Sequence, residues 1–501
     1  MRLLASLSVL ALIPAMASAQ DKAETLPKLP FTSIQPEMFG MVGSLSNAWG
    51  DFDNDGDLDL AVSMKSGEVR LYRNDDGVFV SIGSAMGLPT SGKEFRGLSW
   101  GDYDGDGWLD LHGGATSPKE ISVVFHNEGG KGFREVAEEV GLTLPGRSAR
   151  QSSWIDYDND GDLDFYGTDR IGVNRLYRND DGKFVQAFAD NGITDPRPTV
   201  GACWFDYNGD GKLDLFLANQ SGATDALWRN DGNGFTDVAA EAGVASPGRS
   251  KQEGGVGCAI GDYDNDGLLD IFVPNYGVNA LFRNNGNGTF TNVAEEVGLA
   301  FDNHAVGAAW GDYDNDGFID LSIMSYEGPS GQQVPKNRLL RNVGGKKFVN
   351  VLADDSPMNA GDHSTQWVDY NKDGALDLSI TDGYGPEGGH FLFRNMMAAA
   401  TAKRSLAVQV TDAKGHFTRY GAEVRIKDSK GKILGTRLIS AGDGYNTQSA
   451  LPAYFGLTKM QRVTVEVTFM SNDGRKVQTI RNVNPADYAG KALIVKEDAT
   501  H

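Results

Sequence analysis

DYDNDGDLD, residues 156–164, is one of seven copies of an aspartate-rich nonapeptide in this chain. The other copies are, in chain order, DFDNDGDLD from Asp51, DYDGDGWLD from Asp102, DYNGDGKLD from Asp206, DYDNDGLLD from Asp262, DYDNDGFID from Asp312 and DYNKDGALD from Asp369. Successive copies start 50 to 57 residues apart. A period of this length is typical of a four-stranded propeller blade and is too long for most helical solenoid units.

The residues around each nonapeptide indicate strands. A run rich in β-formers follows it, and a basic residue and an asparagine come 21 to 29 residues after its first aspartate. In six copies these are followed by a turn of Asp, Asn or Gly and then phenylalanine, which predicts a hairpin. Six copies also have a tryptophan two residues before the first aspartate, as in Trp154. We attribute this row of tryptophans to packing between blades rather than to stacking on sugars.

The seventh period predicts how the ring of blades closes. After Arg394 and Asn395 the chain continues as MMAAATAKR and lacks the final phenylalanine strand. Residues 31–41, FTSIQPEMFGM, lie before the first copy and resemble FREVAEEVGL at Phe133. The N-terminus therefore supplies the outer strand of the last blade, and no sheet edge at the closure is left unpaired. We predict an all-β fold, with a seven-bladed β-propeller over residues 29–397.

The nonapeptide has the pattern of a cation-binding loop. In DxDxDGxxD the first three aspartates converge only if the chain turns sharply at position 6, where all seven copies have glycine. A hard cation with oxygen ligands fits this arrangement, and calcium tolerates irregular geometry better than magnesium. The flanking residues alternate as in strands and the twelfth positions lack glutamate, so these loops are not helix-loop-helix EF-hands.

We predict up to seven structural Ca²⁺ ions, held by positions 1, 3, 5 and 9 and by the backbone carbonyl of position 7. In chain order the residues are Asp51, Asp53, Asp55, Asp57 and Asp59; Asp102, Asp104, Asp106, Trp108 and Asp110; Asp156, Asp158, Asp160, Asp162 and Asp164; Asp206, Asn208, Asp210, Lys212 and Asp214; Asp262, Asp264, Asp266, Leu268 and Asp270; Asp312, Asp314, Asp316, Phe318 and Asp320; Asp369, Asn371, Asp373, Ala375 and Asp377. Asn208 and Asn371 lower the charge of the fourth and seventh loops, so their affinity is expected to be weaker.

The charge balance supports a bound cation. The seven nonapeptides contain 28 of the 68 acidic residues. Packed carboxylates repel one another, and burying them without a partner is costly. A solvated acidic turn would explain a single copy, but it does not explain seven copies with the same glycine and spacing.

Composition restricts the classes of function. The 501 residues carry a formal net charge of −22, which argues against a broad nucleic-acid interface and against docking on anionic lipid. Two cysteines exclude a disulfide-rich scaffold and a four-thiolate metal site. Cys203 and Cys258 precede the fourth and fifth Asp loops with opposite strand parity, which favours buried free thiols. A disulfide between them stays open as the alternative in an oxidising compartment.

The N-terminus predicts the compartment. Arg2 precedes an apolar run over residues 3–13, and Ala17-Ser18-Ala19 forms a small-residue cleavage site. Residues 1–19 are therefore predicted to be a secretory signal peptide, and the protein is expected to be periplasmic or secreted. No other stretch is long and apolar enough to predict a membrane span.

These repeats resemble the FG-GAP/VCBS family, whose propellers include the integrin α-subunit head. Beyond the repeats, residues 403–498 alternate as in a small β-sandwich or barrel. Within them, RYGAEVRI from Arg419, AYFGL from Ala453 and VTVEVTFMSNDGRKV from Val463 resemble the ASPIC/UnbV domain. Domains of that kind end the propellers of the cartilage acidic protein-like family. The biochemical activity of that family is poorly defined, so the resemblance implies a fold more firmly than a function.

A ligand site is expected on the face opposite the Asp loops. If each loop joins the first and second strands of its blade, the ions lie on one face, and the chain enters first strands and leaves second strands on the other, around the axis. The candidate ligand-binding residues at these ends are Arg96, Arg150, Glu253, His304, Tyr326, His363 and Asp382.

We favour a binding module for a protein or glycan partner. The alternative is an enzyme, a lyase or hydrolase acting on a carbohydrate or a small molecule in the same axial pocket. Its acid–base candidates would be Glu253, His304, His363 and Tyr326. We assign no catalytic residue, because the chain has no nucleophile elbow, Walker loop, HExxH or dinucleotide motif. A third, weaker hypothesis is a purely structural surface protein.

Overall fold

The structure is a computed structural model that describes residues 29–40, 42–187, 193, 195–326, 336–360, 363–382, 389–439 and 445–498. The predicted signal peptide, residues 1–19, lies outside the described residues. Parts of the loops that leave the second strands of blades 6 and 7, residues 327–335 and 383–388, also lie outside them. Among the described residues, no helix has both the length and the apolar character that crossing a bilayer requires.

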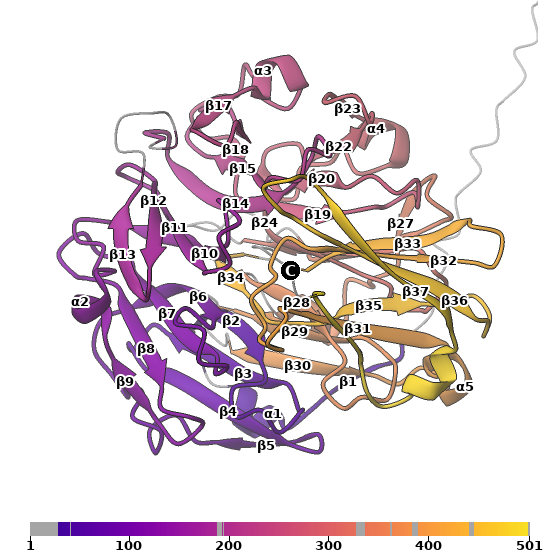
Figure 1. Ribbon diagram of the computed structural model, residues 1–501, viewed down its shortest axis with the longest axis horizontal. Coiled ribbons are helices and arrows are strands. Elements are labelled where there is room, and N and C mark those ends of the chain that lie inside the picture. The colour runs from indigo at the N-terminus through magenta and orange to yellow at the C-terminus, as the bar shows by residue number, and fades with distance from the viewer. Residues whose placement is uncertain are drawn as a thin grey trace, which may run out of the picture.

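Seven antiparallel blades follow one another along the chain (Figure 1). Blade 1 consists of β2 (Ser44–Gly50), β3 (Asp59–Met64), β4 (Val69–Asp75) and β5 (Val78–Ser81), and blade 2 of β6 (Phe95–Gly101), β7 (Asp110–Ala115), β8 (Val123–Asn127) and β9 (Phe133–Glu135). Blade 3 consists of β10 (Ala149–Ile155), β11 (Asp164–Asp169), β12 (Arg175–Asp180) and β13 (Lys183–Gln186), and blade 4 of β14 (Thr199–Phe205), β15 (Asp214–Asn219), β16 (Ala226–Asn230) and β17 (Phe235–Asp237). Blade 5 consists of β19 (Ala259–Gly261), β20 (Asp270–Val273), β22 (Ala280–Asn284) and β23 (Phe290–Asn292). Blade 6 consists of β24 (Ala305–Gly311), β25 (Asp320–Ser325), β26 (Arg338–Asn342) and β27 (Phe348–Asn350). Blade 7 consists of β28 (Thr365–Val368), β29 (Asp377–Thr381), β30 (His390–Asn395) and β1 (Phe31–Ser33). Short helices lie between these elements: α1 (Pro36–Phe39), α2 (Ala137–Val140), α3 (Ala239–Ala242), α4 (Ala294–Val297), η1 (Pro357–Ala360) and α5 (Ala399–Ala402).

The blades form a closed ring, as the repeats predict. The first strand of each blade contacts that of the next, from β2 to β28, and β2 contacts β29 of the last blade. β1 pairs with β30 as the outer strand of blade 7, with Phe31 opposite Asn395. The ring of Phe31 lies 6.2 Å from the rings of both Tyr313 and Trp367. The all-β propeller and its closure by strands from both ends are therefore confirmed.

A repeated asparagine ties each blade to the one before it. The side-chain Nδ2 of this residue donates to the backbone carbonyl at position 2 of the preceding Asp loop, over 2.7–3.1 Å. The donor and acceptor pairs are Asn127 and Phe52, Asn179 and Tyr103, Asn230 and Tyr157, Asn284 and Tyr207, Asn342 and Tyr263, Asn395 and Tyr313, and Asn74 and Tyr370. The last pair joins blade 1 to blade 7 and completes the ring.

The tryptophans pack between blades, as predicted. Trp100 Nε1 donates to the carbonyl of Ala48 in the preceding blade over 3.0 Å, and Trp367 Nε1 donates to Ala309 over 3.2 Å. Trp154 makes the equivalent bond to Ser99 over 3.3 Å. These rings are buried, so their structural role is confirmed.

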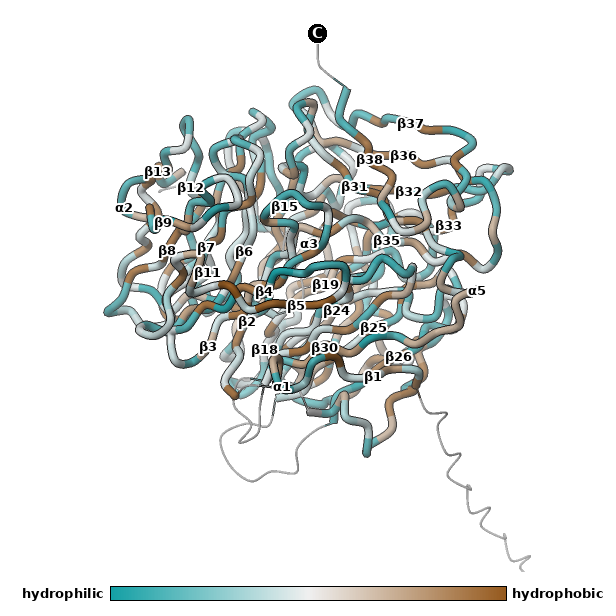
Figure 2. Tube along the Cα trace, turned by 90° about the horizontal axis from the view of Figure 1, so that it is seen from below, coloured by the Kyte–Doolittle hydropathy of each residue, from teal (hydrophilic) through white to brown (hydrophobic). Residues whose placement is uncertain are grey.

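Two further sheets lie on one face of the ring. Figure 2 shows them in a view turned by 90° from that of Figure 1. One has the order β35 (Ala453–Gly456), β31 (Ser405–Thr411) and β38 (Leu493–Lys496). The other has the order β33 (Ile433–Leu438), β32 (Glu423–Lys427), β36 (Val463–Phe469) and β37 (Lys476–Val483), and η2 (Pro485–Tyr488) precedes β38. The C-terminal region is thus a small two-sheet β domain, as predicted.

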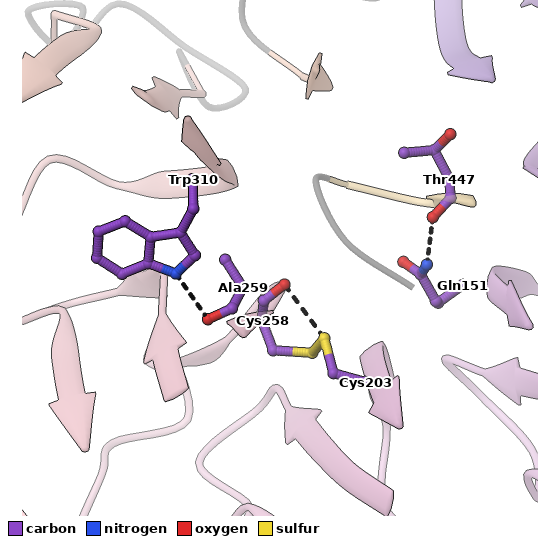
Figure 3. The surroundings of a disulfide bond; sticks show 6 residues. All are labelled: Gln151, Cys203, Cys258, Ala259, Trp310 and Thr447. Carbon is purple, nitrogen blue, oxygen red and sulfur yellow. Dashed lines mark hydrogen bonds between the residues drawn. A yellow bond between two sulfur atoms is a disulfide. The ribbon is translucent and has the colours of Figure 1, made fainter. Parts of the chain in front are cut away.

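One strand of this domain reaches into the propeller. β34 (Thr447–Gln448) pairs in parallel with β6, as a fifth strand of blade 2. The Gln448 side chain accepts from the Trp154 N–H over 2.7 Å and donates to the Trp154 carbonyl over 2.9 Å. Gln151 donates to the Thr447 carbonyl over 2.5 Å (Figure 3). β34 therefore lies among the first strands of the blades, where it contacts β2, β6 and β10.

Cys203 and Cys258 form a disulfide, so the expectation of free thiols is wrong (Figure 3). Their Cα atoms lie 6.2 Å apart. Strand parity is not preserved, because the first strand of blade 5 is interrupted. β18 (Gly254–Gly255) pairs with β21 (Asn275–Tyr276), whereas β19 pairs with β20, and Cys258 lies between the two segments.

Replacing one inter-blade asparagine tests its contribution to stability. Asn179→Ala removes two bonds from the buried Nδ2, to Tyr103 at 2.7 Å and Leu163 at 2.9 Å, and the acceptor of the Gly182 N–H. We expect the free energy of unfolding to fall by about 2–4 kcal/mol in chemical denaturation. Asn287→Ala, on an exposed turn, is the control and should change it by less than about 1 kcal/mol. Equal effects of the two changes would contradict this role.

Candidate functional site

The Asp loops share one conformation, which the carboxylate at position 1 organises. In the third loop, Asp156 accepts the backbone N–H groups of Asp160 and Gly161, both over 3.1 Å. Glycine at position 6 has a φ of 88° to 104° in all seven loops, as at Gly161. Residues with a Cβ rarely adopt this left-handed conformation, which explains the invariant glycine.

The aspartate at position 9 is fully buried in every loop. In the first loop, Asp59 accepts the N–H of Asn74 over 2.9 Å through Oδ1 and that of Phe52 over 3.2 Å through Oδ2. This asparagine is the residue that ties the blades together, so each loop is joined directly to an inter-blade contact. The equivalent bond is present in all seven blades, at 2.7–2.9 Å.

Positions 1, 3 and 9 converge in at least four of the described loops. One carboxylate oxygen from each of the three residues lies within 4.8 Å of the others. The groups are Asp51, Asp53 and Asp59; Asp102, Asp104 and Asp110; Asp156, Asp158 and Asp164; Asp262, Asp264 and Asp270. Three carboxylates at this separation form a cluster of oxygen ligands suited to a hard divalent cation.

Positions 5 and 7 behave differently from positions 1, 3 and 9. The carboxylate at position 5 accepts the backbone N–H of position 7, over 2.8–3.1 Å. The donors are Asp57, Trp108, Asp162, Lys212, Leu268, Phe318 and Ala375. Position 5 thus closes the turn, and its role as a metal ligand stays a prediction.

Burial raises the pKa values of the position-9 carboxylates, and too little positive charge lies nearby to offset this. Burial raises the pKa of Asp59 to about 9, and the charges of Asp53 and Asp51 add to this shift. Burial likewise raises the pKa of Asp164 to about 9. At position 3, one carboxylate oxygen of Asp53 and one of Asp158 are buried with no hydrogen-bond partner among the described residues. A bound cation would stabilise the charged forms and occupy these oxygens, so the loops fit a metal ion.

In six blades an arginine precedes the inter-blade asparagine, and its side chain points in different directions in different blades. Where an aspartate stands two residues after it, the arginine pairs with that aspartate, as Arg178 does with Asp180 at 2.7 Å. Val343 and Met396 stand at this position in blades 6 and 7. There the arginine turns to its own Asp loop, as Arg341 does to Asp314 at 2.6 Å. The loops of blades 6 and 7 therefore already contain a competing cation.

The C-terminal domain covers the face of the Asp loops. Its side chains reach the position-1 carboxylates, with Arg475 Nε 2.9 Å from Asp206 and Arg419 Nη1 3.5 Å from Asp156. Between this domain and the loops of blades 7, 1 and 2 lies a cavity of about 450 Å³. Nothing in the repeat pattern of the sequence indicates where the following domain packs, so these contacts were not predicted.

On the opposite face, most of the predicted ligand residues gather around Tyr445. Arg96 Nη1 lies 3.5 Å from the Tyr445 hydroxyl, and the ring of His363 lies 5.5 Å from that of Tyr445. The row of rings continues from His363 to Tyr326 over 5.7 Å and from Tyr326 to His304 over 6.0 Å. His304 stacks on Tyr276 at 3.9 Å. Tyr445 comes from the C-terminal domain, and no repeat in the sequence pointed to it.

Charge shapes this axial cluster, defined as Arg96, Arg150, Tyr276, His304, Tyr326, His363 and Tyr445. Burial opposes ionisation of Tyr445, but the charges of Arg96 and Arg150 outweigh it and lower the pKa of Tyr445. Burial, followed by the charge of Arg96, holds the pKa of His363 well below its usual value, and the charge of Asp382 opposes this shift. The cluster therefore combines stacked rings with a positive field.

Glu253 does not join this arrangement as a general acid. Its carboxylate accepts the backbone N–H of Ser250 over 2.6 Å, and this bond lowers the pKa of Glu253. Its side chain lies over Gly277, next to Tyr276.

A family model described as the FG-GAP-like repeat matches residues 45–112, 156–217, 206–273 and 262–323. Cartilage acidic protein 1 of Xenopus tropicalis is 26% identical over 473 residues, covering 84% of this chain and 69% of that protein. Cartilage acidic protein 1 of Mus musculus is 29% identical over 269 residues, covering 50% of this chain and 38% of that protein. Among the solved structures that match is the BP39L lectin from Burkholderia pseudomallei, with 12% identity and a TM-score of 0.48, covering 72% of this chain and 98% of that chain. BBS1N in complex with ARL6DN is another, with 9% identity and a TM-score of 0.46, covering 74% of this chain and 98% of that chain.

Metal-free protein should show the carboxylate shifts in its pH dependence. The pKa values of Asp59 and Asp164 are raised to about 9 in the folded state, against about 3.9 when unfolded. Between these values the folded state binds more protons, so the free energy of unfolding falls as pH rises. We expect calorimetry of exhaustively dialysed, metal-free protein to give a higher melting temperature at about pH 5 than at about pH 8. A melting temperature that increases over this interval would contradict the shifts.

Proposed function

We propose that this chain, which contains FG-GAP-like repeats and is similar to cartilage acidic protein 1, is a calcium-binding β-propeller that acts as a binding module for a protein or glycan. The observation that carries the proposal is the convergence of three carboxylates, of which the one at position 9 is fully buried, in each of at least four of the described Asp loops. Calcium suits such oxygen ligands and their irregular geometry. Its role here is structural: it supplies the positive charge that the buried carboxylates lack.

The loops differ in how well they would hold this ion. The first and third loops contain five aspartates each, and Arg73 and Arg178 are held away from them by Asp75 and Asp180. The sixth loop has Arg341 on its carboxylates, and the fourth has Lys212 on Asp210 at 3.3 Å. We therefore expect the tightest binding in the first loop, because Arg419 of the C-terminal domain already lies 3.5 Å from Asp156 of the third.

A periplasmic or secreted location accompanies this function. Disulfides persist in oxidising compartments, and Cys203 and Cys258 form one. The predicted signal peptide points to the same compartments. Extracellular calcium concentrations also suit modules with dissociation constants of about 10⁻⁴–10⁻³ M.

The binding surface that we propose is the axial cluster. The C-terminal domain covers the other face of the ring, as shown by the contacts of Arg419 and Arg475 with the Asp loops. Stacked rings such as those of His304 and Tyr276 are suited to contact a sugar or an aromatic side chain. The enzymatic alternative has less support, because the carboxylate of Glu253 is held by the N–H of Ser250.

Chelation tests the calcium role. At about 1 mM calcium each site would contribute roughly 0.4–1.4 kcal/mol, so excess EGTA should lower the melting temperature by about 10 °C. Asp158→Asn removes a position-3 carboxylate and should weaken calcium binding in the third loop, as measured by calorimetric titration. Asp181→Asn, in an exposed turn, is the control and should leave the calcium affinities unchanged. A melting temperature that EGTA does not change would refute the structural role.

A glycan array tests the binding surface. We expect a saccharide bound by the native chain to lose at least about tenfold in affinity with His304→Ala, because the ring stack is removed. Arg462→Ala, an exposed position on the C-terminal domain, should bind as the native chain does. Equal binding by both variants would place the site elsewhere. Turnover of a bound saccharide that His304→Ala abolishes would instead support the enzymatic alternative.

A further inference from the structure

The Asp loop of blade 2, residues 102–110, has a different neighbour from the other six. Six blades have arginine before the inter-blade asparagine, whereas blade 2 has His126. The Nδ1 atom of His126 lies 3.1 Å from Asp110 Oδ1 and 3.4 Å from Asp104 Oδ2. It therefore contacts the same carboxylates that converge in this loop.

We propose that this loop is a site for a divalent first-row transition-metal ion such as Zn²⁺, with His126 as its nitrogen ligand. The spacing of the atoms fits such an ion. Ligand atoms about 2.0–2.2 Å from a metal, at tetrahedral or octahedral angles, lie roughly 3.0–3.5 Å from one another. The Nδ1 of His126 and the nearest oxygens of Asp104 and Asp110 are at these separations.

The neighbours of His126 explain why it faces the loop. Glu128 stands two residues later, where blades 1, 3 and 4 have an aspartate that holds the arginine. Glu128 instead accepts from Arg134 over 3.0 Å, so it does not draw the imidazole away. The ring of Tyr103, the second residue of this loop, lies edge-on to the ring of His126, with 6.1 Å between the ring centres. Tyr103 therefore packs against the imidazole.

A second imidazole lies against the same loop. His416, from the C-terminal domain, has its Nδ1 atom 3.5 Å from Asp102 Oδ2. This nitrogen is buried and makes no hydrogen bond among the described residues. The backbone N–H of His416 donates to Asp412 over 2.8 Å, which fixes the turn that presents the ring. Two of the seven histidines of the chain are thus placed at one of its seven Asp loops.

The ligand types favour a transition metal over calcium. Calcium takes oxygen ligands, whereas imidazole suits zinc, copper, iron and nickel. The competing explanation is that His126 serves only as a cationic partner of the carboxylates, as Arg341 does in blade 6. Arginine can play that part but cannot ligate a metal, so exchanging the two residues separates the explanations. The proposal does not require calcium in the other six loops.

Cobalt provides a visible probe of this site. The full chain is stripped with EDTA, dialysed, returned to millimolar calcium to fill the hard-cation sites, and then titrated with Co²⁺ by absorption spectroscopy. We expect a single saturating equivalent with the d–d bands of a nitrogen-ligated ion. His126→Arg installs the residue of the other six blades and should weaken Co²⁺ binding by about 100-fold or more. Arg178→Gln, at the same position in blade 3, should leave it unchanged.

Two results would overturn the proposal: no saturable Co²⁺ uptake by the native chain in calcium, or equal uptake by the His126→Arg variant. If that variant fails to fold, His126→Gln replaces it and is judged by the same criterion. Crystals of the native chain grown with Zn²⁺ and measured at the zinc absorption edge give an independent result. An anomalous peak beside His126 supports the site, and the absence of one there contradicts it.

Discussion

A fully buried aspartate stands where the Asp loop meets the second strand of each blade, and the rest of the ring is built on its contacts. The aspartate at position 9 accepts the backbone N–H of the inter-blade asparagine, whose side chain donates to the preceding blade. In blade 3 this chain of contacts runs from Asp164 through Asn179 to Tyr103. The same two residues, Asp164 and Asn179, therefore join the carboxylate cluster of a loop to the contact between one blade and the next.

The C-terminal domain is part of this arrangement rather than an appended module. Its cationic side chains meet position-1 carboxylates, as Arg475 does at Asp206, and its strand β34 lies among the first strands of blades 1, 2 and 3. Tyr445, just before β34, then helps to form the axial cluster on the far side. One segment of the domain thus connects the face of the Asp loops to the proposed binding surface.

Much of the fold follows from short-range patterns that repeat. The period of the nonapeptide, the hairpin signals and the missing strand at residue 395 predict seven blades and their closure through Phe31, because each feature is local or compares one period with another. The loop pattern predicts that positions 1, 3 and 5 converge, whereas the structure brings positions 1, 3 and 9 together and uses position 5 to close the turn. The pairing of Cys203 with Cys258 does not, because an interruption in the first strand of blade 5 changes the parity. The contacts of β34 and the ring of Tyr445 in the axial cluster join segments hundreds of residues apart, and no repeat indicates them.

We propose that metal ions neutralise the clustered carboxylates of the Asp loops. Elemental analysis of native protein, purified without chelators and exchanged into metal-free buffer just before measurement, tests it most directly. The account predicts several calcium ions per chain. Protein that contains almost no alkaline-earth metal and yet retains its full secondary structure and cooperative unfolding would contradict it.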